Sequence, residues 1–346
     1  MLSNKTYNAS DIEVLEGLEP VRKRPGMYIG GTDRNGMHHL FAEVIDNSMD
    51  EAVAGFATFI EVNIDLNNKV TVSDNGRGIP IDKHPKYPNK SALEVILTTL
   101  HAGGKFNNKI YQTSGGLHGV GISVVNALSE SLEVEVYRDK NIYTQRYSKG
   151  IPDNNIQKLD QKTNKKGTKI TFKPDEEIFD KNLKFNIEKL YNFCKSKAYL
   201  FAGIEIRWSC NQLIAEEINI PKSEIFNFSK GLEDFLINEV KDSTFIAQES
   251  FSGKKEKDSK NNSIEWAVNW SMSSDGFLNS YCNTVPTPDG GTHELGLKNG
   301  LLKALRSHSE RIGNKKGLAI NSDDVSKSMV AVISLFIPDP KFQGQT

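Results

Sequence analysis

The segment that most restricts the fold of this chain is residues 114–129, SGGLHGVGISVVNALS. It holds four glycines and a histidine within residues 115–121 and then continues as an apolar stretch of helical character. Glycines directly before a helix are typical of phosphate-binding loops, because free N–H groups and the positive end of the helix dipole meet there. By itself the segment fits a nucleotide loop and a flexible turn before a helix equally well.

Two familiar kinds of phosphate loop do not fit this segment. A Walker A loop needs a lysine and then Ser or Thr after its last glycine, but Gly121 is followed by Ile122 and Ser123. A Rossmann loop has the spacing G-x-G-x-x-G directly after a strand. Here the spacing from Gly116 is G-x-x-G-x-G, and the preceding residues are polar. A phosphate loop at this position is therefore of another type.

A polar row on the helix predicted for residues 37–55 suggests a partner for the glycine segment. Glu43, Asn47 and Asp50 are spaced i, i+4 and i+7, so they share one helix face. A carboxylate and an amide oxygen one turn apart suit a hydrated Mg²⁺, which prefers oxygen ligands. His39 lies one turn before Glu43, close enough to hydrogen-bond and orient it. On this stretch alone, a solvated polar helix face is the more frequent explanation.

A further acidic position lies in the stretch VTVSDNGRGIP, residues 70–80. A predicted strand ends in Asp74, and Gly76 and Gly78 follow it. A carboxylate at a strand end can accept hydrogen bonds from the amino group of adenine, and the glycines let the backbone approach a flat base closely. A plain hairpin turn is the alternative for this stretch.

The pattern of the whole chain predicts two α+β units. Alternating apolar and polar residues predict strands at 60–66, 69–76, 132–138, 142–147 and 168–173. Apolar residues at helical spacing predict helices at 37–55, 91–102, about 122–128 and 230–240. The polar segment 150–167 predicts an exposed loop, and 253–262 predicts a hairpin tip. The helical stretch from 230 places the boundary near residue 222, which gives domains of 1–222 and 223–346.

Composition excludes several classes of protein. The chain has 43 basic and 44 acidic residues, so no overall field attracts nucleic acid or membrane, and any DNA contact has to come from a local patch. Three scattered cysteines argue against a disulfide framework and a zinc site. The N-terminus has no apolar signal-peptide core, and no window approaches the roughly 20 apolar residues of a membrane span. We therefore expect a cytoplasmic protein with no membrane partner.

Together and in this order, the three stretches resemble the GHKL ATPases, the ATP-binding fold shared by type II topoisomerases, Hsp90-type chaperones, MutL-type repair proteins and sensor histidine kinases. In that family a glutamate-to-asparagine helix, a D-x-G-x-G turn and a glycine-rich lid surround one nucleotide. Here these are Glu43–Asn47, Asp74–Gly78 and Gly115–Gly121. The resemblance implies the GHKL (Bergerat) α/β sandwich with ATP and Mg²⁺. It also implies that Glu43 is the general base, supported by His39, and that Asn47 binds the metal.

Further stretches narrow the resemblance to bacterial type II topoisomerase ATPase subunits, and they span essentially the whole chain. They are EGLEPVRKRPGMYIG (16–30), LHAGGKF (100–106), PTPDGGTHELG (286–296) and DPKFQGQT (339–346). TYNASDIEVLEGLEPV and SYCNTVPTPDGGTH are more similar to the B subunit of topoisomerase IV than to the B subunit of DNA gyrase. Gln112, where gyrase relatives often carry lysine, agrees with that choice. The PTPDGGTH stretch also argues against a MutL- or Hsp90-type ATPase.

The resemblance assigns roles to residues around the nucleotide. Asp74 would take the adenine amino group, with Thr168 beside it. Tyr7 lies in an N-terminal arm that, in the family, crosses to the partner protomer and contacts its nucleotide. Other positions that match nucleotide contacts or the glycine lid are Gly78, Gly103, Lys105, Tyr111, Gly115, Gly116, Leu117, His118, Gly119, Val120 and Gly121.

Two arginines match the mouth of the pocket, where coumarin-type inhibitors bind in relatives: Arg77 and Arg138. From the residues alone, both of these and Lys105 fit ordinary surface positions as well. Thr168 equally fits the start of an ordinary strand, and Tyr7 fits a tyrosine packed on its own domain.

The second domain resembles the transducer of these enzymes, an α/β unit of the ribosomal S5 domain 2 type that reports the γ-phosphate to the rest of the protein. In relatives a closing loop supplies a glutamine and, two residues later, a lysine that contacts this phosphate. Gln345 matches the glutamine, but the sequence stops at Thr346, so we expect a truncated fragment whose hydrolysis is impaired.

The implied function is an ATP-operated clamp that couples dimerisation to DNA strand passage. The implied partners are DNA, the breakage-reunion (A) subunit of topoisomerase IV and a second copy of this chain in an ATP-dependent homodimer. DNA cleavage itself would need a nuclease-like domain and a tyrosine-bearing partner chain, so the fragment is expected to bind ATP without cutting DNA.

Overall fold

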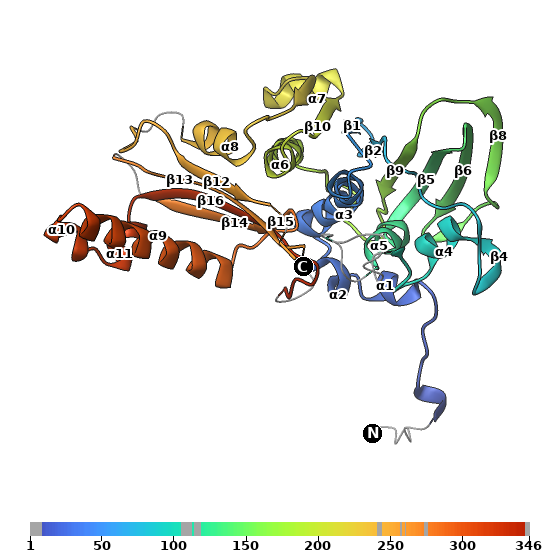
Figure 1. The fold of residues 1–346 in the computed structure, drawn as a ribbon. Coiled ribbons are helices and arrows are strands. Elements are labelled where there is room, and N and C mark those ends of the chain that lie inside the picture. The colour runs from blue at the N-terminus through green and yellow to red at the C-terminus, as the bar shows by residue number, and fades with distance from the viewer. Residues whose placement is uncertain are drawn as a thin grey trace.

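The computed structural model describes residues 9–104, 113, 119–240, 244–256, 258–259, 261–272 and 276–342. The described chain forms two α+β units, each built on its own large β-sheet. Figure 1 shows these units side by side, with helices α3 and α6 lying between the first sheet and the second unit. The segment before α1 extends away from the body of the molecule (Figure 1).

The first unit contains the helices and strands up to residue 226. A short 3₁₀ turn (Ala9–Asp11) precedes them. Its helices are α1 (Glu19–Lys23), α2 (Gly26–Ile29), α3 (Arg34–Val53), α4 (Ala92–Thr98), α5 (Gly121–Ala127), α6 (Ile187–Leu200) and α7 (Gln212–Ile218). Its strands are β1 (Phe59–Ile64), β2 (Val70–Asp74), β3 (Lys83–His84), β4 (Tyr87–Ser91), β5 (Ser129–Arg138), β6 (Asn141–Ser148), β7 (Ile151–Pro152), β8 (Gln157–Lys162), β9 (Gly167–Pro174), β10 (Glu205–Cys210) and β11 (Ser223–Phe226).

The first sheet runs in the order β11-β10-β1-β2-β9-β5-β6-β7 within the described residues, and β8 pairs with β6 beside β7. Most neighbours are antiparallel, and β1 and β10 are parallel. The hairpin β1–β2 places Ile60 opposite Asp74, so Asp74 stands at the end of a central strand. Because β9 pairs with both β2 and β5, its first residues lie next to that end.

Helix α3 packs against the sheet through its apolar face. Asp33 caps its start by accepting a hydrogen bond from Gly36 N at 3.0 Å, and Phe41, Val44 and Ile45 are buried. The alternation of buried and exposed residues along β1 and β2 supplies the other half of the same core. This packing fixes which face of α3 is left for polar residues, the face that carries Glu43 and Asn47.

The second unit has a five-stranded sheet in the order β12-β13-β16-β14-β15 within the described residues. Its elements are α8 (Leu232–Glu239), β12 (Phe251–Lys255), β13 (Ser263–Trp270), β14 (Phe277–Cys282), β15 (Val285–Pro286), α9 (Thr292–Arg311), α10 (Lys315–Leu318), α11 (Ser322–Ser326) and β16 (Met329–Phe336). Strand β16 is central and buried along most of its length. Helices α8 and α9 cover the sheet with separate apolar clusters.

Helix α6 belongs to the cores of both units. Its residues Leu190, Cys194 and Ala198 pack in the core of the first unit. Its last residues, Tyr199 and Leu200, pack in the cluster formed by α8 and the second sheet. The Tyr199 ring stacks on Phe228 with a centroid separation of 3.7 Å. Movement of α6 relative to one unit would therefore disturb the other.

Two expectations about secondary structure need correction. The helix expected at 91–102 ends at Thr98 in α4. The segment 150–167, expected to be a loop, contains strands β7 and β8. Every β8 residue is exposed, so the strand lacks the alternating burial that would have revealed it.

The domain boundary expected near residue 222 stays a prediction, and strand β11 bears on its exact position. Strand β11 begins at Ser223 and pairs with β10, so it completes the first sheet. We therefore propose that the division between the units falls after Phe226 and before α8.

Candidate functional site

The carboxylate of Glu43 and the amide of Asn47 lie one helical turn apart on α3, as the sequence predicted. Glu43 and His39 are half-buried, and His39 Nε2 lies 3.2 Å from Glu43 Oε1. Burial by itself would lower the pKa of His39, but the hydrogen bond to Glu43 and the charges of Glu43 and Asp46 raise the pKa above its ordinary value. His39 is thus placed to hold Glu43 in one orientation.

Helix α5 begins directly against Glu43. A Cβ atom on Gly121 would lie 1.8 Å from Glu43 Oε2, so the carboxylate can occupy this position only because residue 121 is glycine. Val120 stands at the N-cap position and has no polar side chain with which to cap the helix. The first N–H groups of α5 and the Glu43 carboxylate therefore border the same space.

Asp74 lies at the end of β2 in a buried polar pocket. Its carboxylate accepts hydrogen bonds from Gly76 N at 2.9 Å and Ser48 Oγ at 3.1 Å. Burial raises the pKa of Asp74 to about 6, and hydrogen bonds from the Gly76 and Thr168 amides and from Ser48 counteract only part of this rise. Above about pH 6 the Asp74 carboxylate is therefore a charged, buried hydrogen-bond acceptor.

Thr168 lies beside Asp74, as the resemblance implied. It is buried at the start of β9, and its Oγ1 accepts a hydrogen bond from Ile79 N at 3.1 Å. The loop after β2 is thereby fixed to β9. Gly78 has φ of +78°, and a Cβ there would lie 3.1 Å from Gly167 O, so both its conformation and its surroundings favour glycine.

The two arginines assigned to the pocket mouth both lie at this loop. Arg77 forms an ion pair with Glu51, with Nη2 2.6 Å from Oε1, and its guanidinium carbon lies 3.8 Å from the centroid of the Phe56 ring. Arg138 donates from Nη1 to the carbonyl oxygen of Gly78 at 3.3 Å. Ion pairing, stacking and the backbone contact thus orient both guanidinium groups.

Gly103 and Gly119 approach each other across the edge of the site. A Cβ on Gly103 would lie 3.8 Å from Gly119 Cα, so the segment that follows α4 meets the glycine-rich stretch here. The structure does not describe several residues that the sequence analysis assigned to the nucleotide: Tyr7, Lys105, Tyr111, Gly115, Gly116, Leu117, His118 and Gln345. Their assignments stay predictions.

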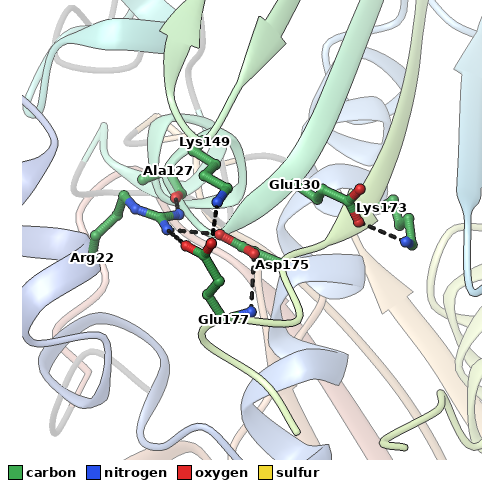
Figure 2. Close-up of polar contacts among 7 residues, drawn as sticks. All are labelled: Arg22, Ala127, Glu130, Lys149, Lys173, Asp175 and Glu177. Atoms are coloured by element: carbon green, nitrogen blue, oxygen red, sulfur yellow. Dashed lines mark hydrogen bonds and ion pairs between the residues drawn. The ribbon is translucent and has the colours of Figure 1, made fainter. Parts of the chain in front are cut away.

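The far end of α5 is held by a charged cluster, which Figure 2 shows. Arg22 of α1 donates to Ala127 O at the end of α5 and to Asp175 Oδ2, both at 2.7 Å. Glu177 lies between Arg22 and Lys149, with an ion pair of 2.6 Å to the lysine. A cation at a helix C-terminus satisfies a free carbonyl and interacts favourably with the helix dipole. Arg22 thereby connects α1 to the end of α5, the helix whose first residue, Gly121, lies against Glu43.

Two residues that contribute to the site were missed from the sequence. Ser48 donates to Asp74, and Glu51 accepts hydrogen bonds from Arg77 N at 2.9 Å and Nε at 3.1 Å. Glu51 could have been found, because it lies one turn after Asn47 on the same helix face. Ser48 gave no signal, since a serine adjacent to a polar row is not distinguished by spacing.

Comparisons with known proteins identify the family. The profile of histidine kinase-, DNA gyrase B- and HSP90-like ATPases matches residues 32–178, and the DNA gyrase B profile matches residues 231–346. The fold superimposes with a TM-score of 0.78 on the 43K ATPase domain of Thermus thermophilus gyrase B, which was solved in complex with an aminocoumarin. The two chains are 35% identical, over 94% of this chain and 82% of the other. The chain belongs to the gyrase B and topoisomerase IV B family.

Within this family the chain is more similar to topoisomerase IV relatives than to gyrase relatives. It is 54% identical to the B subunit of DNA topoisomerase 4 from Bartonella bacilliformis, over 99% of its own length and 50% of the relative's. It is 42% identical to the B subunit of DNA gyrase from Synechocystis, over all of this chain and 32% of the relative. The chain spans about half the length of the topoisomerase 4 relative. The expected GHKL ATPase plus transducer architecture is thus confirmed.

Proposed function

We propose that this chain forms the ATP-operated gate of a bacterial type II DNA topoisomerase of the topoisomerase IV B type. The observation that carries the proposal is the convergence of Glu43 on α3, Asp74 on β2 and the start of α5 at Gly121. Family membership and the higher identity to topoisomerase 4 relatives support the choice over gyrase.

The pocket around Asp74 suits adenine. A buried carboxylate that accepts hydrogen bonds can bind an exocyclic amino group, which adenine has at the position where guanine has a carbonyl oxygen. Because its pKa is about 6, Asp74 is charged and accepts hydrogen bonds at physiological pH. Guanine would direct an oxygen at this carboxylate, so the pocket favours ATP over GTP.

Glu43 is placed to act as general base in hydrolysis. It would take a proton from a water molecule that attacks the terminal phosphate, while His39 keeps its carboxylate in position. The oxygen donors of Glu43 and Asn47 fit Mg²⁺, with Asn47 as the proposed ligand. A bound Mg²⁺ would neutralise negative charge on the phosphates during transfer. The N–H groups at the start of α5 face the same space and would contact phosphate oxygens.

We propose that helices α9 and α10 form the local basic patch that DNA binding requires. Residues 298–316 contain six basic side chains, Lys298, Lys303, Arg306, Arg311, Lys315 and Lys316, and one acidic residue, Glu310. Most of these basic residues are exposed, in a chain whose overall charge is near zero. Such a patch supports binding of a DNA backbone through phosphate contacts, without selection for sequence.

The segment before α1 supports the proposed homodimer. Ile12 and Val14 are 59% and 77% exposed, although they are apolar, and the segment extends away from its own domain (Figure 1). A second copy of the chain would cover these side chains.

We further propose the breakage-reunion (A) subunit of topoisomerase IV as a partner and the cytoplasm as the location. Within the described residues, no helix combines the length and apolarity needed to cross a membrane.

Light scattering during addition of a non-hydrolysable ATP analogue with Mg²⁺ tests the gate directly. We expect the mass of the particle to double with the ATP analogue and to stay unchanged with the matching GTP analogue. A monomer at saturating ATP analogue would refute the gate. With the full-length protein and its breakage-reunion partner, decatenation without supercoiling is expected, and supercoiling would instead indicate a gyrase.

A further inference from the structure

A buried lysine connects the helix that carries Glu43 to the second unit. Lys197 lies on α6 with its side chain 2% exposed, and its Nζ is 2.6 Å from Asp46 Oδ1 on α3. The same Nζ donates to the carbonyl oxygen of Thr284 at 2.7 Å. Asp46 lies between Glu43 and Asn47 in the sequence, so the ion pair holds the helix turn from which both site residues project.

The acceptor of Lys197 belongs to an unusual turn. Asn283 and Thr284 join β14 to β15, and their φ angles are +49° and +67°. This is the backbone of a tight hairpin turn that favours Asn-Gly, and a β-branched threonine is disfavoured in its second position. The carbonyl oxygen that Lys197 binds is therefore fixed by a strained turn, which persists only where its surroundings hold it.

The turn is also fixed to the central strand of the second sheet. Asn283 Nδ2 donates to Ile337 O at 2.9 Å, and Ile337 N donates to Asn283 Oδ1 at 2.8 Å. Asn283 N in addition donates to Leu335 O at 2.7 Å. Ile337 follows directly after β16, where the chain leaves the sheet toward its last residues. A continuous set of polar contacts thus runs from α3 through Lys197 and the turn to the end of β16.

Packing along α6 makes this set of contacts sensitive to displacement. Residues on α6 before Lys197 pack in the first core, and Tyr199 and Leu200 after it pack in the second. A shift of α3 relative to α6 would separate Asp46 from Lys197 and leave a buried charge without its partner. Leaving a buried charge without its partner is strongly destabilising. The Asp46–Lys197 ion pair therefore favours two discrete arrangements of α3 and α6, one with the pair formed and one with it broken, over a gradual displacement.

From this geometry we infer that Lys197 is the positioning residue through which occupancy of the nucleotide site changes the β14–β15 turn and the end of β16. The inference rests on the proposed ATP gate. Among the residues that the structure describes, Lys197 is linked to the nucleotide site through Asp46 and does not belong to the site itself. Its loss should therefore affect transmission to the second unit more than nucleotide binding.

Hydrogen exchange of this chain, followed by mass spectrometry with and without a non-hydrolysable ATP analogue, tests the inference. In the unmodified chain we expect the analogue to change exchange in peptides that contain the amides of Asn283 and Ile337. In K197M the analogue should still bind, with Kd changed by less than about threefold, while that response falls by about tenfold, within the range of coupling between sites. K169M is the matched control, because it removes a lysine from an ion pair with Glu135 remote from α6, and it should respond fully.

The possible outcomes separate this inference from the proposed function. Failure of the unmodified chain to bind the analogue would overturn the gate itself. Normal binding without any response in these peptides, or a full response in K197M, would overturn the role of Lys197. Should K197M be unfolded at the assay temperature, the double variant D46N/K197M removes both charges together and leaves no unpaired carboxylate. That double variant is expected to bind the analogue and to lack the response, and a full response from it would likewise overturn the inference.

Discussion

Replacing Asp74 with asparagine should make the nucleotide-free protein more stable while weakening ATP binding. The side chain is 7% exposed, and burial raises its pKa from 3.8 to about 6. The folded state therefore holds this proton more tightly than the unfolded chain does. The contribution of this tighter proton binding to the free energy of unfolding is fully present below pH 3.8. It declines as the pH rises toward 6 and is lost above about 6.

The size of the effect follows from the pKa. A rise from 3.8 to about 6 makes the charged form of the folded state about 3 kcal/mol less favourable. Asparagine has a similar shape, and its carbonyl oxygen can accept the hydrogen bond from Gly76 N. The figure of about 3 kcal/mol already includes the hydrogen bonds that the charged carboxylate accepts from Gly76, Ser48 and Thr168. The gain in unfolding free energy of D74N above pH 6 is therefore about 3 kcal/mol, and below pH 3.8 the gain should vanish.

Chemical denaturation of both proteins at several pH values measures this difference, and titration calorimetry with an ATP analogue measures binding. Loss of a hydrogen bond to a charged group costs about 1.5–3 kcal/mol, so Kd should rise about 10- to 100-fold in D74N. A variant that is less stable than the unmodified protein by the same amount at every pH would refute the desolvated carboxylate. Unchanged affinity would refute its role in adenine binding.

Three further substitutions test other parts of the site. Glu43→Ala should keep ATP affinity but lower turnover on the order of 10²–10⁴-fold, and normal hydrolysis would show that another group is the base. In Gly121→Ala the added methyl group would lie 1.8 Å from Glu43 Oε2, so the carboxylate has to move away. We expect kcat to fall with little change in the melting temperature, and an active variant would contradict this arrangement. Arg22→Met should lower the unfolding free energy by about 2 kcal/mol, because it leaves Ala127 O uncapped and buried Asp175 without its cation. The control Lys173→Met removes the exposed ion pair with Glu130, which Figure 2 shows, and the ion pair with Glu176. It should cost about 0.5 kcal/mol or less by the same denaturation assay.

Local patterns in the sequence predicted most elements of the first sheet. The helix at 37–55 is α3, and the strands at 60–66 and 69–76 pair as β1 and β2. These elements have one buried face, so their apolar periodicity reports directly on burial. Strand β8 has no buried residue, and it joins the sheet through backbone pairing with β6 and a hydrogen bond from Lys162 Nζ to Asn141 Oδ1 at 2.7 Å. Backbone pairing leaves no mark on side-chain pattern, so this strand could not be predicted in the same way.

For the site, spacing along one helix predicted the contact between His39 and Glu43, and the family resemblance implied that Asp74 and Thr168 lie close together. Contacts between elements that are distant in sequence were beyond this reasoning. Lys197 lies on α6, a helix that was not predicted from the sequence, and its partner Asp46 is not distinguished by pattern from neighbouring acids on α3. Only the packing of α6 between two cores shows that this lysine is buried and bound on both sides.

The buried aspartates of the first unit differ in their partners, and this difference separates binding from structure. Asp175 has Arg22 at 2.7 Å, so its charge is balanced when the chain folds. Asp74 is nearly as buried, yet the described part of the chain offers its carboxylate amide and hydroxyl donors, and its pKa is raised. A protein selected for stability alone would gain by replacing such a residue. Asp74 lies beside the loop that contains Gly78. In the bound state the amino group of the ligand would donate a further hydrogen bond to this carboxylate, which explains why a charged group is placed there. The stability advantage of D74N over the unmodified protein should therefore fall by about 1.5–3 kcal/mol when saturating nucleotide is present.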